Sequence, residues 1–134
     1  MSRDKGARGE REVKDLLNAF FEEIGYNVQM KRNQFQTLEG GYDLVGLPFL
    51  AIEIKFVEQL ALNSWWAQTV EQTKPGQHPV LFYRQSRKPW RVRMIGAPKP
   101  DSVAMRINLV IDISVDDFLR WLKEMLITQT GEEL

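Results

Sequence analysis

The sequence predicts an α/β protein of one domain, in which helices flank a mixed β-sheet. The first observation is the order of its elements, which reads helix, three strands, helix, three strands, helix. The second is a helix between two apolar strands, residues 50–56 and 79–84, because such a crossover joins parallel strands. The third is the length of 134 residues, which is enough for one hydrophobic core and too little for two domains.

The first half of the chain is expected to form a helix followed by strands. Apolar residues from Val13 to Ile24 recur at the spacing of one helical face, and Gly25 ends that pattern. A polar, glycine-ended stretch then separates an alternating segment from an apolar hairpin. The expected elements are a helix over residues 7–25, a strand over 26–32, a loop over 33–41 and hairpin strands over 42–46 and 50–56.

The second half is expected to hold a helix, three strands and a last helix. Asn63 or Ser64 is the expected cap of the first helix, and Pro75 follows its end. Ser114 and Asp117 match a capping box for the last helix. The expected elements are a helix over residues 65–73, strands over 79–84, 90–95 and 107–113, a loop over 96–102, and a helix from Ser114 that gives way to a frayed tail over 128–134.

The composition excludes several classes of protein. Without cysteine the chain can form no disulfide, no thiolate zinc site and no cysteine nucleophile. A single histidine, His78, argues against histidine-ligated metals and Ser-His-Asp catalysis. No apolar run reaches the roughly 18 residues of a membrane span, and the first ten residues are too charged for a signal peptide. We therefore expect a cytoplasmic protein, located in the host cytoplasm if its source is viral.

The net charge is zero, but the charges are unevenly distributed along the chain. Residues 74–106 hold eight basic side chains and one acidic one, a net charge of +7. Residues 107–134 hold two basic and six acidic side chains, a net charge of −4. This asymmetry favours an anionic partner for the basic block, although a solvated basic face without a partner is an equally good interpretation.

Three charges stand inside the apolar hairpin of residues 40–56, and they are expected to share one face. If the turn lies at residues 47–49, Asp43 lies opposite Glu53, with Cβ atoms about 5 Å apart. Side-chain alternation places Lys55 on the same face. Two carboxylates this close repel unless a cation lies between them, and their oxygens suit Mg²⁺ or Mn²⁺. A register slip of one residue would separate the pair.

A third acid, Glu10, is expected to reach the same patch. It lies on the apolar stripe of the first helix, three residues before Val13 and seven before Leu17, so that packing of the stripe carries Glu10 toward the sheet. The alternative is that Glu10 only complements the helix dipole in an exposed first turn. Glu12-Val-Lys14 repeats the Glu-x-Lys spacing, but on a helix these two side chains point in different directions and cannot form a site.

Taken in order, Glu10, Asp43 and Glu53-x-Lys55 resemble the motif of the PD-(D/E)XK nuclease superfamily. The superfamily core runs α-β-β-β-α-β, so the resemblance implies a restriction-endonuclease-like fold. One departure is Tyr42, which stands where the motif has proline.

Within the superfamily, the stretch Lys5-Gly-Ala-Arg-Gly-Glu-Arg11 is similar to the opening of archaeal-type Holliday-junction resolvases. Residues 65–68 together with 79–84 resemble small phage proteins of the same kind. The resemblance covers about residues 5–95, which leaves residues 96–127 as a C-terminal extension within a single nuclease domain.

The resemblance implies metal-dependent hydrolysis of phosphodiester bonds. The implied ligands of one or two Mg²⁺ or Mn²⁺ ions are Glu10, Asp43, Glu53 and the Ile54 carbonyl. Lys55 would orient the attacking water or stabilise developing charge. Gln68, on the helix after the hairpin, would contact that water or Lys55, and an amide that only caps a neighbouring backbone group is the alternative.

The expected substrate is branched DNA, bound by lysine and arginine contacts to phosphates. The candidate contacts are Lys5, Arg8, Arg11, Lys31, Arg32, Arg84, Arg87, Lys88, Arg91 and Arg93. A four-way junction has two-fold symmetry and needs paired cuts, which implies a homodimer. The alternatives are another nuclease of the superfamily, such as a virus-type replication-repair, flap or nicking enzyme, and a non-catalytic DNA-binding module.

Overall fold

The computed structural model describes residues 2–33, 43–96 and 109–130, which form three helices and a six-stranded sheet. The elements are α1 (Ser2–Ile24), β1 (Lys31–Arg32), β2 (Leu44–Val45), β3 (Leu50–Val57), α3 (Leu62–Gln72), β4 (His78–Gln85), β5 (Arg91–Gly96), β6 (Leu109–Ser114) and α4 (Val115–Thr130). The predicted α/β class is confirmed. None of the described helices is long and apolar enough to cross a membrane.

The strands lie side by side in the order in which they occur in the chain, from β1 to β6. Every neighbouring pair is antiparallel except β3 and β4, which run parallel. The chain between β3 and β4 passes through α3, as the predicted crossover requires. The sheet is therefore mixed, and β6 extends it beyond β5.

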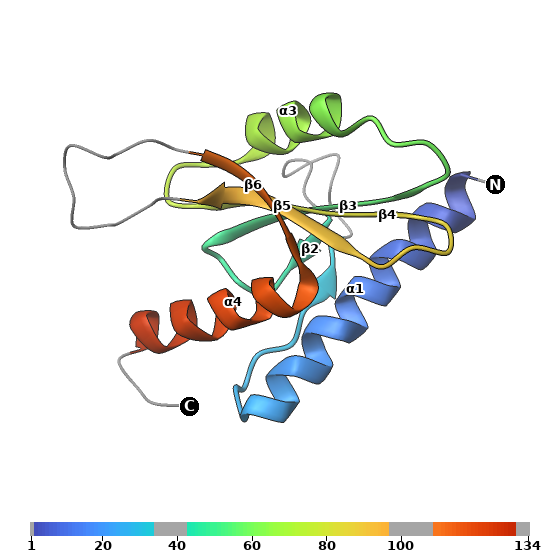
Figure 1. The fold of residues 1–134 in the computed structure, drawn as a ribbon. Coiled ribbons are helices and arrows are strands. Elements are labelled where there is room, and N and C mark those ends of the chain that lie inside the picture. The colour runs from blue at the N-terminus through green and yellow to red at the C-terminus, as the bar shows by residue number, and fades with distance from the viewer. Residues whose placement is uncertain (1, 34–42, 97–108, 131–134) are drawn as a thin grey trace.

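Helices cover both faces of the sheet (Figure 1). The helices α1 and α4 lie against one face, and α3 lies against the other. The main core is on the first face, where Phe21 of α1, Phe82 of β4 and Phe118 of α4 are fully buried. The helix α3 packs less extensively against the sheet, since Thr69 is its one buried residue.

The first helix approaches β3 most closely at Gly9. A Cβ atom at this position would lie 2.9 Å from Phe56 Cβ and 3.3 Å from Trp90 Cη2. Only glycine permits this approach without displacing the helix. Glu10, the next residue, is thereby held near the edge of β3 where the hairpin charges lie.

Several predicted boundaries differ from the structure. The strand expected over residues 26–32 is reduced to β1, because Asn18 binds both backbone groups of Met30: its Oδ1 accepts from Met30 N at 2.7 Å and its Nδ2 donates to Met30 O at 3.2 Å. The helix expected from residue 7 begins at Ser2. The helix α3 begins after Ala61 without a side-chain cap, so the predicted caps Asn63 and Ser64 lie inside it.

The predicted cap of the last helix is present. Ser114 Oγ accepts a hydrogen bond from Asp117 N at 3.1 Å. The helix then continues to Thr130, past the expected start of a frayed tail at Thr128, and Thr128 Oγ1 donates to Glu124 O at 3.0 Å. Gly96, predicted as the first residue of a loop over 96–102, is the last residue of β5. The rest of that loop and most of the loop predicted over 33–41 lie outside the described residues.

Candidate active site

The predicted register of the β2–β3 hairpin is confirmed. Leu44 pairs with Ile52 as predicted, and the carboxyl groups of the next residues along, Asp43 and Glu53, interact with each other. Asp43, the residue before β2, donates its N–H to Ile52 O at 2.7 Å and not to Glu53, so the regular pairing ends at Leu44. Both acidic residues are only 5% exposed. The two carboxyl groups therefore share one buried patch, as the alternation of side chains requires.

Asp43 is fixed by backbone hydrogen bonds from its neighbours. Its Oδ2 atom accepts a hydrogen bond from Ile54 N at 2.7 Å, and its carbonyl oxygen accepts one from Asn33 N at 2.9 Å. In an extended strand the N–H and C=O of one residue project toward the same edge. The Ile54 carbonyl consequently faces the edge at which Asp43 lies.

Glu53 carries a strongly shifted pKa. Burial raises the pKa of its carboxyl most, the neighbouring Asp43 carboxylate raises it further, and Lys55 opposes both, giving a pKa of about 9. Lys55 Nζ lies 3.9 Å from Glu53 Oε1, and the lysine side chain is 27% exposed. At neutral pH Glu53 is therefore protonated and hydrogen-bonded to Asp43, with a lysine at its open side.

These residues line a cavity of about 550 Å³ between α1 and β3. Its lining consists of Lys5, Gly6, Glu10, Asp43 and residues 53–59. Glu10 therefore lies in the same cavity as the hairpin acids and contributes to the raised pKa of Glu53, although among the described residues it does not complete a three-carboxylate metal site with them. Its carboxylate is paired with Arg32, whose Nε atom lies 2.8 Å from Glu10 Oε1.

The donor atoms of this cavity suit a hard divalent cation. Among the described residues, no three Asp, Glu, His or Cys side chains are gathered closely enough to hold a metal ion. Magnesium, however, is commonly bound through one or two carboxylates, with water and substrate phosphates completing its octahedron. Asp43, Glu53 and the adjacent Ile54 carbonyl provide such a set, and two carboxyl groups in contact need a cation before both can ionise.

Comparison with protein families gives the family of the chain. A family model described as "Phage putative PDDEXK endonuclease" matches residues 1–114. The chain belongs to this phage PDDEXK endonuclease family. The predicted resemblance to PD-(D/E)XK nucleases is thereby confirmed.

A solved structure shares the fold of the endonuclease. It is Hjc of Archaeoglobus fulgidus, a Holliday junction resolvase from a hyperthermophilic archaeon. The two chains are 20% identical and superpose with a TM-score of 0.51, over 87% of this chain and 96% of the resolvase. The restriction-endonuclease-like fold is therefore shown. A comparison with curated protein sequences gives no match.

The structure does not bring Gln68 to the acids of the endonuclease. Gln68 lies on α3 with an exposed side chain and is not among the residues that line the cavity. The predicted role of Gln68 in catalysis consequently has no support from the geometry of this site.

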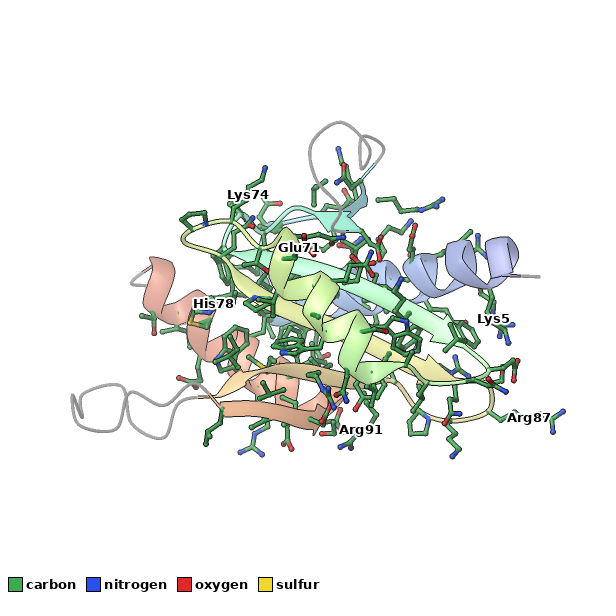
Figure 2. The ribbon with its side chains drawn as sticks, turned by 90° about the horizontal axis from the view of Figure 1, so that it is seen from above. Lys5, Glu71, Lys74, His78, Arg87 and Arg91 are labelled. Atoms are coloured by element: carbon green, nitrogen blue, oxygen red, sulfur yellow. The ribbon has the colours of Figure 1, made fainter. Side chains whose placement is uncertain are left out.

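Several predicted DNA contacts gather around Phe56, beside the cavity. Lys5 Nζ, Arg8 Cζ and Arg84 Cζ lie 5.2, 5.3 and 4.9 Å from the centroid of its ring. The Lys5 ammonium also contacts Glu58 and donates to Ser86 Oγ at 2.8 Å. Lys5 and Arg87, in the turn after β4, lie at the same end of the sheet (Figure 2).

The sequence analysis missed the role of Glu12. Its Oε1 atom accepts hydrogen bonds from Arg84 at 2.7 Å and Trp90 at 3.0 Å, and its Oε2 atom accepts one from Arg8 at 2.9 Å. Burial alone would raise the pKa of the Glu12 carboxyl, but these hydrogen bonds and the charge of Arg84 hold the pKa below its ordinary value. The spacing of four residues between Arg8 and Glu12 was a usable signal.

The remaining predicted DNA contacts differ in whether they already bind acceptors within the protein. Arg93 is bound through two hydrogen bonds of 2.9 Å to Asp112, which also accepts from Tyr83 Oη at 2.8 Å. Arg91 contacts the Asp112 carbonyl at 3.4 Å. Arg91 is nevertheless exposed, as are Arg11, Lys31, Arg87 and Lys88. Arg84 and Arg93 therefore already form ion pairs with carboxylates of the protein itself.

Proposed function

We propose that this endonuclease is a metal-dependent Holliday-junction resolvase, which acts as a homodimer and makes paired nicks in four-way DNA junctions. The observation that carries the proposal is the set of Asp43, Glu53 and Lys55 on one face of the β2–β3 hairpin, at the edge of a cavity. The shared fold with an archaeal resolvase supports the choice of substrate.

In the proposed mechanism, Asp43, Glu53 and the Ile54 carbonyl hold Mg²⁺ or Mn²⁺, with Glu10 as a further ligand. The cation would neutralise charge on the attacked phosphate and acidify water beside it. Asp43 is positioned for this role by Ile54 N, and Glu53 is positioned by the register of β3. Glu53 would release its proton on binding the cation, because the positive charge compensates its burial.

Lys55 would act on the substrate side of the site. Its ammonium is partly exposed and lies at the open side of Glu53, where it can donate to a phosphate oxygen or to the attacking water. The chain need supply little further chemistry, because phosphodiester hydrolysis depends mainly on positioning and charge stabilisation. Gln68 belongs to the proposal on the resemblance alone, and Gln68→Ala should lower cleavage far less than Asp43→Asn does.

The decisive experiment is a cleavage panel with Mg²⁺, using a four-way junction, a flap, a mismatch and plain duplex. The proposal predicts symmetric nicks in the junction at least about tenfold faster than cleavage of plain duplex. Asp43→Asn and Glu53→Gln should lose about 10²–10³-fold or more of the cleavage rate while still binding the junction. The matched control is Glu71→Gln, an exposed carboxyl on α3 (Figure 2).

Two outcomes of this panel would redirect the proposal. Equal cleavage of junction and plain duplex would contradict a resolvase and favour another nuclease of the superfamily. Cleavage that persists in both hairpin variants would contradict the assigned site. The homodimer is tested separately, by sedimentation of the free protein and of its complex with one junction.

A further inference from the structure

Glu10, a proposed metal ligand, forms an ion pair with Arg32. Arg32 Nε donates to Glu10 Oε1 at 2.8 Å, which joins β1 to α1 across 22 positions of sequence. The Glu10 side chain is 18% exposed and the Arg32 side chain is 50% exposed. Glu10 lines the cavity with Asp43 and Glu53, so Arg32 binds one of the three acids of this cavity. The Arg32 guanidinium therefore already neutralises a carboxylate that a bound metal ion would need as a ligand.

The backbone of Arg32 is fixed beside the same acids. Arg32 pairs with Leu44 across β1 and β2, and the next residue, Asn33, donates its N–H to the Asp43 carbonyl. The strand therefore holds the arginine one residue from Asp43. A change of partner by Arg32 requires only its long side chain to rotate, because the backbone is already part of the sheet.

The chemistry of the pair favours an exchange of partners. A half-exposed ion pair stabilises a fold only slightly, because water competes for both charges. Glu10 uses Arg32 Nε, which leaves the two terminal nitrogens of the guanidinium for other acceptors. A planar guanidinium matches two oxygens of a phosphate in a fork geometry. A divalent cation beside Glu10 would also repel the guanidinium.

We propose that Arg32 is a positioning residue that couples phosphate binding to metal binding at Glu10. In the free protein Arg32 binds the Glu10 carboxylate, so that Glu10 is not available as a metal ligand. When a DNA phosphate takes the guanidinium, Glu10 is released to the cation. This inference rests on the proposed metal-dependent cleavage of DNA. Because such coupling is reciprocal, metal bound at Glu10 also frees Arg32 for the phosphate.

The test measures Mn²⁺ affinity by calorimetry without DNA, so that its readout is independent of cleavage. Arg32→Gln should bind Mn²⁺ about threefold to tenfold more tightly than wild type, because Glu10 is no longer held. Lys31→Gln is the matched control, since it removes the same charge from the neighbouring exposed residue of β1. Lys31→Gln should stay within about twofold of wild type.

A double-mutant cycle separates an effect through Glu10 from a general effect of charge. In a Glu10→Gln background, Arg32→Gln should no longer change the Mn²⁺ affinity. If Arg32→Gln is no tighter than Lys31→Gln, or tightens Mn²⁺ binding equally in both backgrounds, the coupling is overturned while metal dependence stands. If wild type binds no Mn²⁺, metal dependence and the coupling both fail.

A second measurement addresses the phosphate side and uses different variants. In EDTA, Glu10→Gln should bind a four-way junction more tightly than Glu71→Gln, because the freed Arg32 can contact phosphate. Adding Arg32→Gln to Glu10→Gln should remove this gain. A gain that survives in the double variant would contradict the proposed exchange of partners even if the metal measurement agreed with it.

Discussion

At the scale of the residue, Glu53 is a carboxyl group whose burial opposes its ionisation. Its carboxyl is buried against Asp43, and burial followed by that neighbouring charge raises its pKa from 4.5 to about 9. The folded protein keeps this proton between those two pH values, whereas the unfolded chain has released it. The contribution of Glu53 to folding stability should therefore be complete below the lower value and be lost as pH rises toward the higher one, since the native state then binds more protons than the unfolded state.

Glu53→Gln should remove this pH dependence in the metal-free protein. Glutamine has the same shape and can still hydrogen-bond Asp43, but it has no proton to lose. In urea denaturation with EDTA, the wild type should lose at least about 1 kcal/mol of stability between about pH 5 and pH 8, and the variant should lose much less.

The matched control for this measurement is Glu71→Gln, which neutralises an exposed carboxyl of α3 (Figure 2). It should keep the slope of the wild type. An unchanged slope in Glu53→Gln would show that another group carries the pH dependence of stability.

At the scale of the element, the contact between α1 and β3 depends on Gly9. Gly9→Ala should destabilise the protein by about 1–3 kcal/mol, although alanine favours helix, because its methyl group would overlap Phe56 Cβ, 2.9 Å away. Displacement of α1 would also move Glu10, so cleavage should slow with the loss of stability. Urea denaturation and junction cleavage measure the two effects.

Gly6→Ala is the control on the same helix. A Cβ atom at Gly6 meets nothing within 4 Å, so this change should stabilise the protein by about 0.5–1 kcal/mol through helix propensity. Equal effects of the two substitutions would contradict a close packing contact at Gly9.

The hairpin shows which features of the fold and site are accessible to sequence reasoning. Its register follows from a short turn and from alternation with a period of two, both of which are local, and the pairing of Leu44 with Ile52 confirms it. The convergence of Asp43 and Glu53 is a direct geometric consequence. Their positions could therefore be predicted without any knowledge of the rest of the chain.

The features that escaped prediction depend on contacts between residues far apart in sequence. The strand predicted over residues 26–32 is shortened to β1 because Asn18 of α1 forms hydrogen bonds with the backbone groups of Met30. The start of α1 is held by Lys5, which contacts Glu58 and Ser86. Hydropathy patterns report which face is buried, but they do not report which polar partner a side chain will choose.

At the scale of the whole molecule, folding partly cancels the segregation of charge along the chain. The pairing of β5 with β6 joins the basic block to the acidic C-terminal region, so that Arg93 meets Asp112. What remains exposed of the basic block includes Arg87 and Lys88, in the turn that follows Ser86. Because Ser86 contacts Lys5 beside the cavity, this turn lies next to the proposed site.

We therefore expect DNA to approach from the end of the sheet that holds the turn between β4 and β5. The variant Arg87→Gln/Lys88→Gln should weaken junction binding and reduce the salt slope, log Kobs against log[salt], by up to about 2, since each phosphate contact contributes about 0.9. The matched control, Arg120→Gln/Lys123→Gln, removes two exposed cations from α4 and should leave the slope unchanged. Fluorescence anisotropy over a range of KCl, in an Asp43→Asn background that prevents cleavage, measures both variants. Equal losses in the two would show that DNA binding follows net charge and not the position of this turn.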